Sequence, residues 1–66
     1  MKNTIKVERA IKNMTQQDLA TAIGVSRQTI NSMEAGKYVP STVLVLKIAR
    51  CFDKTVDDIF TLEDND

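Results

Sequence analysis

The stretch from residue 15 to residue 36, TQQDLATAIGVSRQTINSMEAG, constrains the fold more than any other part of the chain. Apolar residues recur at helical spacing as far as Gly24, where glycine suits the left-handed backbone that ends a helix. Ser26 can cap a second helix, and Val25 before it is expected to point inward. Gly36 ends the second helix. The stretch therefore predicts two short helices joined by a tight glycine turn.

The first of these helices begins with a capping signal. The hydroxyl of Thr15 can accept a backbone hydrogen bond, and Asp18 stands where a capping box usually has Glu or Gln. Because aspartate is shorter, the sequence leaves the reciprocal bond of the box open. Two helices at this spacing are typical of a helix-turn-helix, in which the second helix enters the major groove of DNA.

The second helix has one arc without any large apolar side chain. At about 100° per residue, that arc holds Arg27, Gln28, Asn31, Ser32 and Ala35. The opposite arc holds Thr29, Ile30, Met33 and Glu34. Arg can pair with guanine, and Asn or Gln with adenine. A solvated polar face is the alternative, but the caps and the glycine turn favour base reading by Arg27, Gln28, Asn31 and Ser32. Arg27, at the helix start, could contact phosphate instead.

Many positions of the chain together resemble the Cro/C1-type (XRE-like) helix-turn-helix family, which includes the lambdoid phage repressors. The matching residues are Thr15-Gln16, Leu19-Ala20, Gly24-Val25-Ser26, Ile30, Glu34, Gly36, Pro40-Ser41, Leu44, Leu46-Lys47-Ile48-Ala49 and Ile59-Phe60. The resemblance covers nearly the whole chain and extends to small stand-alone dimeric repressors. It implies an all-α, five-helix, lambda-repressor-like domain that binds operator DNA as a homodimer. It also implies that Arg9 pairs with Glu34, the alternative being a solvated arginine.

The first helix is expected to start after a cap at Asn3 or Thr4 and to run to about Lys12. Its apolar members are Ile5, Val7, Ala10 and Ile11. A later helix, capped by Ser41, should run from Thr42 to about Cys51. It is apolar around more than half of its circumference, with Leu46 among the apolar residues, and is therefore expected to be buried as the hub of the core.

A short fifth helix is expected over residues 56–59, capped by Thr55. Residues 60–62 could then pair with residues 1–3 as a two-stranded β ribbon, as the resembled repressors of similar size suggest. The last residues, 63–66, are expected to be disordered.

Phosphate contacts are expected around the two helices of the motif. The candidates are Thr15, Gln16, Ser26, Lys37, Tyr38 and Ser41. Gln16 begins a helix, and helix N-termini attract anions. For Tyr38 the alternative is a packing role with its hydroxyl in water, and for Lys37 it is plain solubility.

Composition excludes several classes of function. Sixty-six residues make one domain, 1–66. Cys51 is the only cysteine and histidine is absent, so we expect no disulfide, no metal site and no cofactor. Asp57 and Asp58 would point about 100° apart on a helix, so no enzyme is expected. The absence of a membrane span or signal peptide predicts a cytoplasmic protein. No residues remain for an effector domain, so no small-molecule effector is expected.

Charge is divided unequally along the chain. Residues 1–50 hold eight Lys and Arg against three acids, a balance of +5, whereas residues 51–66 hold one Lys against six acids, a balance of −5. A basic body with an acidic end is expected of a protein that presents one face to double-stranded DNA. The alternative is that the acidic end only improves solubility.

A homodimer is expected because a chain of this size buries only about 60% of its unfolded surface and needs further burial. The candidate interface combines the apolar C-terminal residues with one loop residue: Val39, Val56, Ile59, Phe60 and Leu62. The sequence leaves open which of Ile59 and Phe60 closes the monomer's own core. The predicted function is a transcriptional regulator, most simply a repressor of a palindromic operator. The alternative is an antitoxin-like protein that neutralises a partner protein, although only six residues follow Phe60 to supply a neutralising segment.

Overall fold

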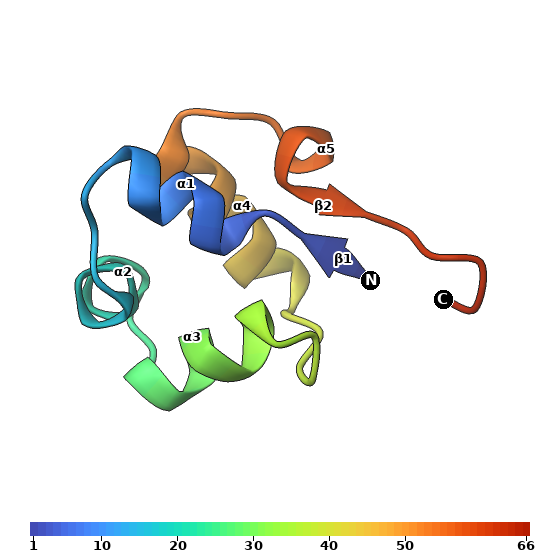
Figure 1. The fold of residues 1–66 in the computed structure, drawn as a ribbon, viewed down its shortest axis with the longest axis horizontal. Helices are drawn as coiled ribbons and strands as arrows, with labels where there is room; N and C mark the ends of the chain where they lie inside the picture. The colour runs from blue at the N-terminus through green and yellow to red at the C-terminus, as the bar shows by residue number, and fades with distance from the viewer.

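The computed structural model describes residues 1–66 as five helices and two short strands (Figure 1). The elements in chain order are β1 (Lys2–Asn3), α1 (Ile5–Ile11), α2 (Gln16–Ile23), α3 (Arg27–Glu34), α4 (Thr42–Phe52), α5 (Val56–Ile59) and β2 (Phe60–Thr61). The strands β1 and β2 pair antiparallel, with Lys2 opposite Thr61. The predicted all-α domain with a terminal β ribbon is confirmed.

Local side-chain hydrogen bonds fix where the helices begin. The Thr15 hydroxyl accepts from the backbone N–H of Asp18 at 2.9 Å, and the Asp18 carboxylate accepts from the backbone N–H of Thr15 at 2.9 Å. The reciprocal bond that the sequence left open is therefore present, and it is the largest cause of a lowered pKa at Asp18. Thr55 and Asp58 form the same box at α5. Gly24 ends α2 with a left-handed φ of 77°, as predicted.

The core lies between all five helices and β2. Its buried side chains are Ile5, Leu19, Ala20, Ile23, Ile30, Met33, Ile48, Ala49, Phe52, Ile59 and Phe60. Helix α4 is the longest element and packs against α2 and α5, whereas α2 packs against α3 and α4, so the predicted hub role of α4 is shared with α2. The buried arc of α4 is narrower than predicted, because Leu46 is exposed.

The inward face of α1 differs from the prediction. Val7 is 56% exposed and Ile11 is 65% exposed, whereas Glu8 is buried beside Ile5. The Glu8 carboxylate is compensated by Lys54, whose Nζ lies 3.0 Å from Oε2. A charge can be buried when it is paired in this way, and the partner comes from the distant turn between α4 and α5.

Asn3 holds the N-terminal strand against the helices, and the C-terminal residues contact the N-terminal amine. The Asn3 side chain accepts from the backbone N–H of Ile5 at 3.2 Å, so Asn3 rather than Thr4 supplies the side-chain acceptor at the start of α1. Its amide nitrogen donates to the carbonyl of Met33 near the end of α3, at 2.9 Å. Residues 63–66 are exposed, and the N-terminal amine contacts Glu63 and Asp66. Their predicted disorder stays a prediction.

None of the five helices combines the length and the apolar character that crossing a bilayer requires.

Candidate nucleic-acid interface

Helix α3 divides into a buried arc and an exposed arc. Ile30 and Met33 are fully buried, and the cap Ser26 starts the helix by accepting from the backbone N–H of Thr29 at 3.1 Å. The predicted base readers lie on the other side. Arg27, Gln28 and Asn31 are exposed, and Ser32 is half-buried. The structure thus brings all four residues onto one solvent-facing arc of the helix.

The side chains of this arc differ in whether they already have a hydrogen-bond partner within the chain. The side chains of Arg27 and Gln28 form no hydrogen bond or ion pair within the chain, so both are available to a ligand. Asn31 is already held: its Oδ1 accepts from the amide nitrogen of Gln16 at 3.3 Å. An amide held in place needs less ordering when it binds.

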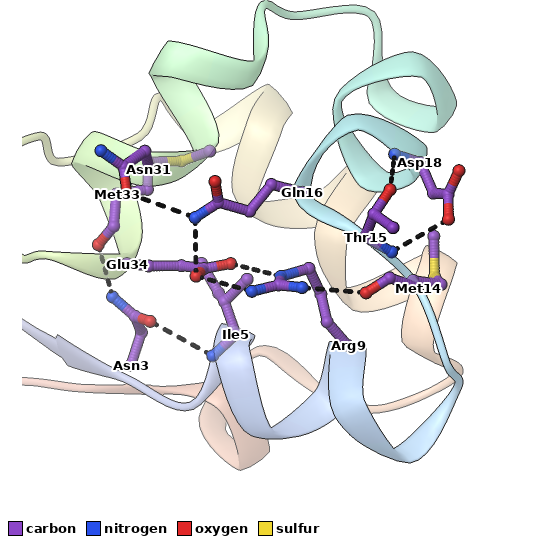
Figure 2. Close-up of polar contacts among 10 residues, drawn as sticks. All are labelled: Asn3, Ile5, Arg9, Met14, Thr15, Gln16, Asp18, Asn31, Met33 and Glu34. Carbon is purple, nitrogen blue, oxygen red and sulfur yellow. Dashed lines mark hydrogen bonds and ion pairs between the residues drawn. The ribbon is translucent and has the colours of Figure 1, made fainter.

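An ion pair joins α1 to the last residue of α3 (Figure 2). Arg9 Nε lies 2.6 Å from Glu34 Oε2, and Arg9 Nη2 donates to Glu34 Oε1 at 3.0 Å. The remaining guanidinium nitrogen, Nη1, donates to the carbonyl of Met14 at 2.8 Å. The two side chains are only 13% and 7% exposed. The pairing implied by the family resemblance is present, and one guanidinium joins α1, α3 and the chain leading into α2.

The environment of this pair changes the titration of both partners. Burial acts to raise the pKa of Glu34, but the hydrogen bonds from Arg9 and Gln16 and the charge of Arg9 outweigh it, so the pKa lies below its usual value. The hydrogen bond to Glu34 raises the pKa of Arg9. Both groups are therefore charged near neutral pH, and the bidentate geometry makes the pair a strong one.

The side chain of Gln16, a predicted phosphate contact, has two partners within the chain. Its amide nitrogen donates to Glu34 Oε1 at 3.2 Å and to Asn31 Oδ1 at 3.3 Å, so both N–H bonds of the side chain are already used (Figure 2). Only its backbone N–H, at the first position of α2, is left for an anion. Sequence reasoning missed this role because the two partners of Gln16 lie 15 and 18 residues away.

The other predicted phosphate contacts lie at helix starts and in the loop after α3. The hydroxyl oxygens of Thr15, Ser26 and Ser41 each accept the capping bond of their helix. A hydroxyl that accepts a bond still has its own proton to donate. Lys37 and Tyr38 are exposed in the loop.

The apolar residues predicted for a dimer interface do not all reach the surface. Ile59 is 1% exposed and Phe60 is 6% exposed, so both close the monomer's own core and offer little to a partner chain. Val39 and Leu62 are exposed, and Val56 is half-buried. Two residues that the sequence did not assign to an interface, Val43 and Leu46, are exposed on α4.

Comparison with known proteins agrees with this geometry. A helix-turn-helix family model, HTH_3, matches residues 5–59. The chain is 53% identical over 66 residues to an uncharacterized HTH-type transcriptional regulator of Methanocaldococcus jannaschii, with all of both chains covered. It is 44% identical over 64 residues to the uncharacterized HTH-type transcriptional regulator YgzD of Bacillus subtilis, with 97% of each covered.

Solved structures show the same architecture. The restriction-modification controller protein C.AhdI from Aeromonas hydrophila matches with a TM-score of 0.77 and 28% identity, over 85% of each chain. The clp gene regulator ClgR from Corynebacterium glutamicum matches with a TM-score of 0.76 and 28% identity, over 82% of this chain and 57% of that one. The chain therefore belongs to the HTH_3 helix-turn-helix family of Cro/C1 (XRE-like) type, whose members are DNA-binding transcriptional regulators and not enzymes.

Proposed function

We propose that this protein is a sequence-specific regulator, most simply a repressor, that binds a palindromic operator in double-stranded DNA as a homodimer. The observation that carries the proposal is the exposed polar arc of α3, a helix whose last residue is joined to α1 by the Arg9–Glu34 ion pair. Side chains that read bases must be held in a fixed register against the groove. Repression rather than activation rests on the resemblance to the lambdoid phage repressors.

Phosphate contacts would position this arc without reading sequence. The backbone N–H groups of Gln16 and Gln17 have no partner within the chain, as is usual in the first turn of a helix, and such groups bind anions. The hydroxyls of Thr15, Ser26 and Ser41 can add donors, and Lys37 adds a positive charge beyond the end of α3. The proposal includes a cytoplasmic location.

Base readers and phosphate contacts are separable by mutation. Gln28→Ala and Asn31→Ala should each relax the preferred sequence at one or two base pairs, with a loss of about 1–3 kcal/mol of discrimination per bidentate contact. Lys37→Ala should weaken binding to all sequences alike. The measurement is selection from a random pool of duplexes, followed by affinities for the selected site and for single-base-pair variants of it.

The base-reader variants and the phosphate-contact variant serve as controls for each other. The base-reader variants should lose discrimination between sequences, whereas the phosphate-contact variant should lose affinity for all sequences. If Gln28→Ala lowered the affinity uniformly and left the preferred sequence unchanged, Gln28 would not be a base reader. Selection of no preferred sequence by the wild-type protein would contradict the proposed function.

The proposed dimer interface is revised by the burial of Ile59 and Phe60. It retains Val39, Val56 and Leu62 and gains Val43 and Leu46, which are large apolar side chains exposed at the surface. The loop before α4 and the strand β2 lie toward the same end of the longest axis of the molecule (Figure 1). A palindromic operator requires two copies of α3 about one helical turn of DNA, near 34 Å, apart, and the proposed pairing is the one that has to supply this spacing.

Sedimentation tests the dimer. The wild-type protein should sediment as a dimer at micromolar concentration, and Leu62→Asp should shift it toward monomer because an unpaired charge would be buried in the interface. Ile11→Asp is the matched control, since Ile11 is comparably exposed but lies at the far end of α1. A monomeric wild type that binds a palindromic site without cooperativity would contradict the proposal. The antitoxin-like alternative predicts instead that a second protein co-purifies.

A further inference from the structure

We propose that Gln16 is a positioning residue that orients the side-chain amide of Asn31 and thereby sets which base Asn31 prefers. The inference rests on the proposed function, in which α3 reads bases in the major groove. It deepens that function by adding a residue of α2 that is not itself required to contact the DNA. The inference is argued from the hydrogen-bonded series Arg9–Glu34–Gln16–Asn31 (Figure 2).

The first step is the orientation of Gln16. An ionised carboxylate can only accept hydrogen bonds, so the group that faces Glu34 Oε1 at 3.2 Å must be the NH2 end of the Gln16 amide. Glu34 is kept ionised by the guanidinium of Arg9, at 2.6 Å from its other oxygen. The ion pair therefore excludes the reversed amide of Gln16, in which an oxygen would face an oxygen.

The second step passes the orientation to Asn31. The nitrogen of Gln16 that donates to Glu34 also donates to Asn31, and only an acceptor can face it. The Asn31 group at 3.3 Å is accordingly Oδ1, and Nδ2 points away from Gln16 (Figure 2). The oxygen and the NH2 group of an asparagine amide have nearly equal shapes, so the amide can take either of two orientations. No other side chain that contacts Asn31 favours one orientation over the other.

The third step concerns base reading. Adenine is read by an asparagine whose Nδ2 donates to N7 and whose Oδ1 accepts from the N6 amino group. The oxygen of Asn31 gives one lone pair to Gln16 and keeps the other, while both N–H bonds of Nδ2 remain free. Asn31 can thus make this bidentate contact without first reorienting. Reversal of the amide would exchange its donor and acceptor and so change which base edge it matches.

The chain provides a matched control for Gln16 in the next residue. Gln17 has the same side chain on the same helix, but it is exposed and its amide donates to the Thr21 hydroxyl of α2 at 3.2 Å. Methionine replaces either glutamine with little change of volume and removes only the amide. Gln16→Met and Gln17→Met therefore differ in whether the contact to Asn31 is lost.

The experiment measures affinities for the selected operator and for the same operator with the Asn31 base pair replaced. Gln16→Met should reduce the discrimination between these two duplexes by about 2- to 10-fold, the cost of ordering one free side chain. Both variants keep the backbone N–H groups proposed to face phosphate, so binding to unrelated DNA should be equal in Gln16→Met and Gln17→Met. Gln17→Met should not change the discrimination. In an Asn31→Ala background, Gln16→Met should have no further effect on discrimination, because the residue it orients is gone. Circular dichroism at the assay temperature confirms that each variant is folded.

Two other outcomes are distinct. A uniform loss of affinity in Gln16→Met, with unchanged discrimination, would make Gln16 a phosphate contact and overturn the inference while leaving the proposed function intact. A wild type that does not discriminate between any duplexes would contradict the proposed function itself, and the role of Gln16 with it.

Discussion

Arg9→Met is expected to lower the free energy of unfolding by about 3 kcal/mol, because it leaves the carboxylate of Glu34 buried without its cation. The substitution also removes the donor to the carbonyl of Met14, at 2.8 Å. A chain of 66 residues has a free energy of unfolding of roughly 3–10 kcal/mol, so this loss is about a third or more of the total. Urea unfolding followed by circular dichroism measures the difference.

The pH dependence identifies the cause of that loss. Folded Glu34 has a pKa below its usual value of 4.5, so the unfolded chain takes up the proton first as the pH falls. The stabilisation from the pair is present above about pH 4.5 and disappears as the pH falls through the lower pKa of the folded state. Without Arg9, burial raises the pKa of Glu34, so the variant takes up the proton at a higher pH than the wild type does. The stability gap between wild type and Arg9→Met should therefore narrow as the pH falls through the range in which Glu34 becomes protonated. The double variant Arg9→Met/Glu34→Met should be more stable than Arg9→Met alone. A loss below about 0.5 kcal/mol, typical of surface substitutions, would show that Arg9 is effectively solvated.

The affinity for operator DNA is expected to fall by roughly 10³-fold between 50 and 200 mM salt, as for a protein that makes at least six phosphate contacts. The reason is that each phosphate neutralised by the protein releases condensed counterions. The balance of +5 in residues 1–50 supplies the charge, and two copies of the chain double the number of contacts. Fluorescence anisotropy of a labelled operator over a salt series gives the slope.

Lys37→Ala should reduce the magnitude of this slope by about 2 in a dimer, about 1 for each copy. Gln28→Ala is the control, because a neutral base reader releases no counterions and should leave the slope unchanged. An affinity that is flat between low and physiological ionic strength would contradict the phosphate-contact model.

Much of the fold could be predicted because its signals are local. Each of these signals involves residues only a few positions apart, so the sequence itself shows every partner. They are the capping box at Thr15 and Asp18, the left-handed Gly24 and the cap at Ser26. The division of α3 into a buried and an exposed arc follows from helical periodicity alone. These local features placed the helix-turn-helix correctly.

The features that could not be predicted depend on partners distant in sequence. The hydrophobic pattern of α1 favours burial of Val7 over Glu8, but Lys54 arrives from the turn before α5 and makes burial of Glu8 possible. The sequence predicts Gln16 as a surface residue at a helix start, whereas in the folded chain the packing of α3 places Glu34 beside it. In both cases a polar group finds its partner only after the helices have packed, and no spacing rule anticipates that.

The terminal ribbon bears on the order in which the molecule can be assembled during its synthesis. Strand β1 is made long before β2, and the backbone N–H of Thr4 bonds to the carbonyl of Ile59 at 2.9 Å. Asn3, in the early strand, holds the carbonyl of Met33 near the end of α3. While the chain is still growing, the helices of the DNA-binding motif can form before β2 has been made, so the pairing of β1 with β2 comes after them. The ribbon is therefore completed after the reading helix, although one of its residues, Asn3, holds the end of that helix.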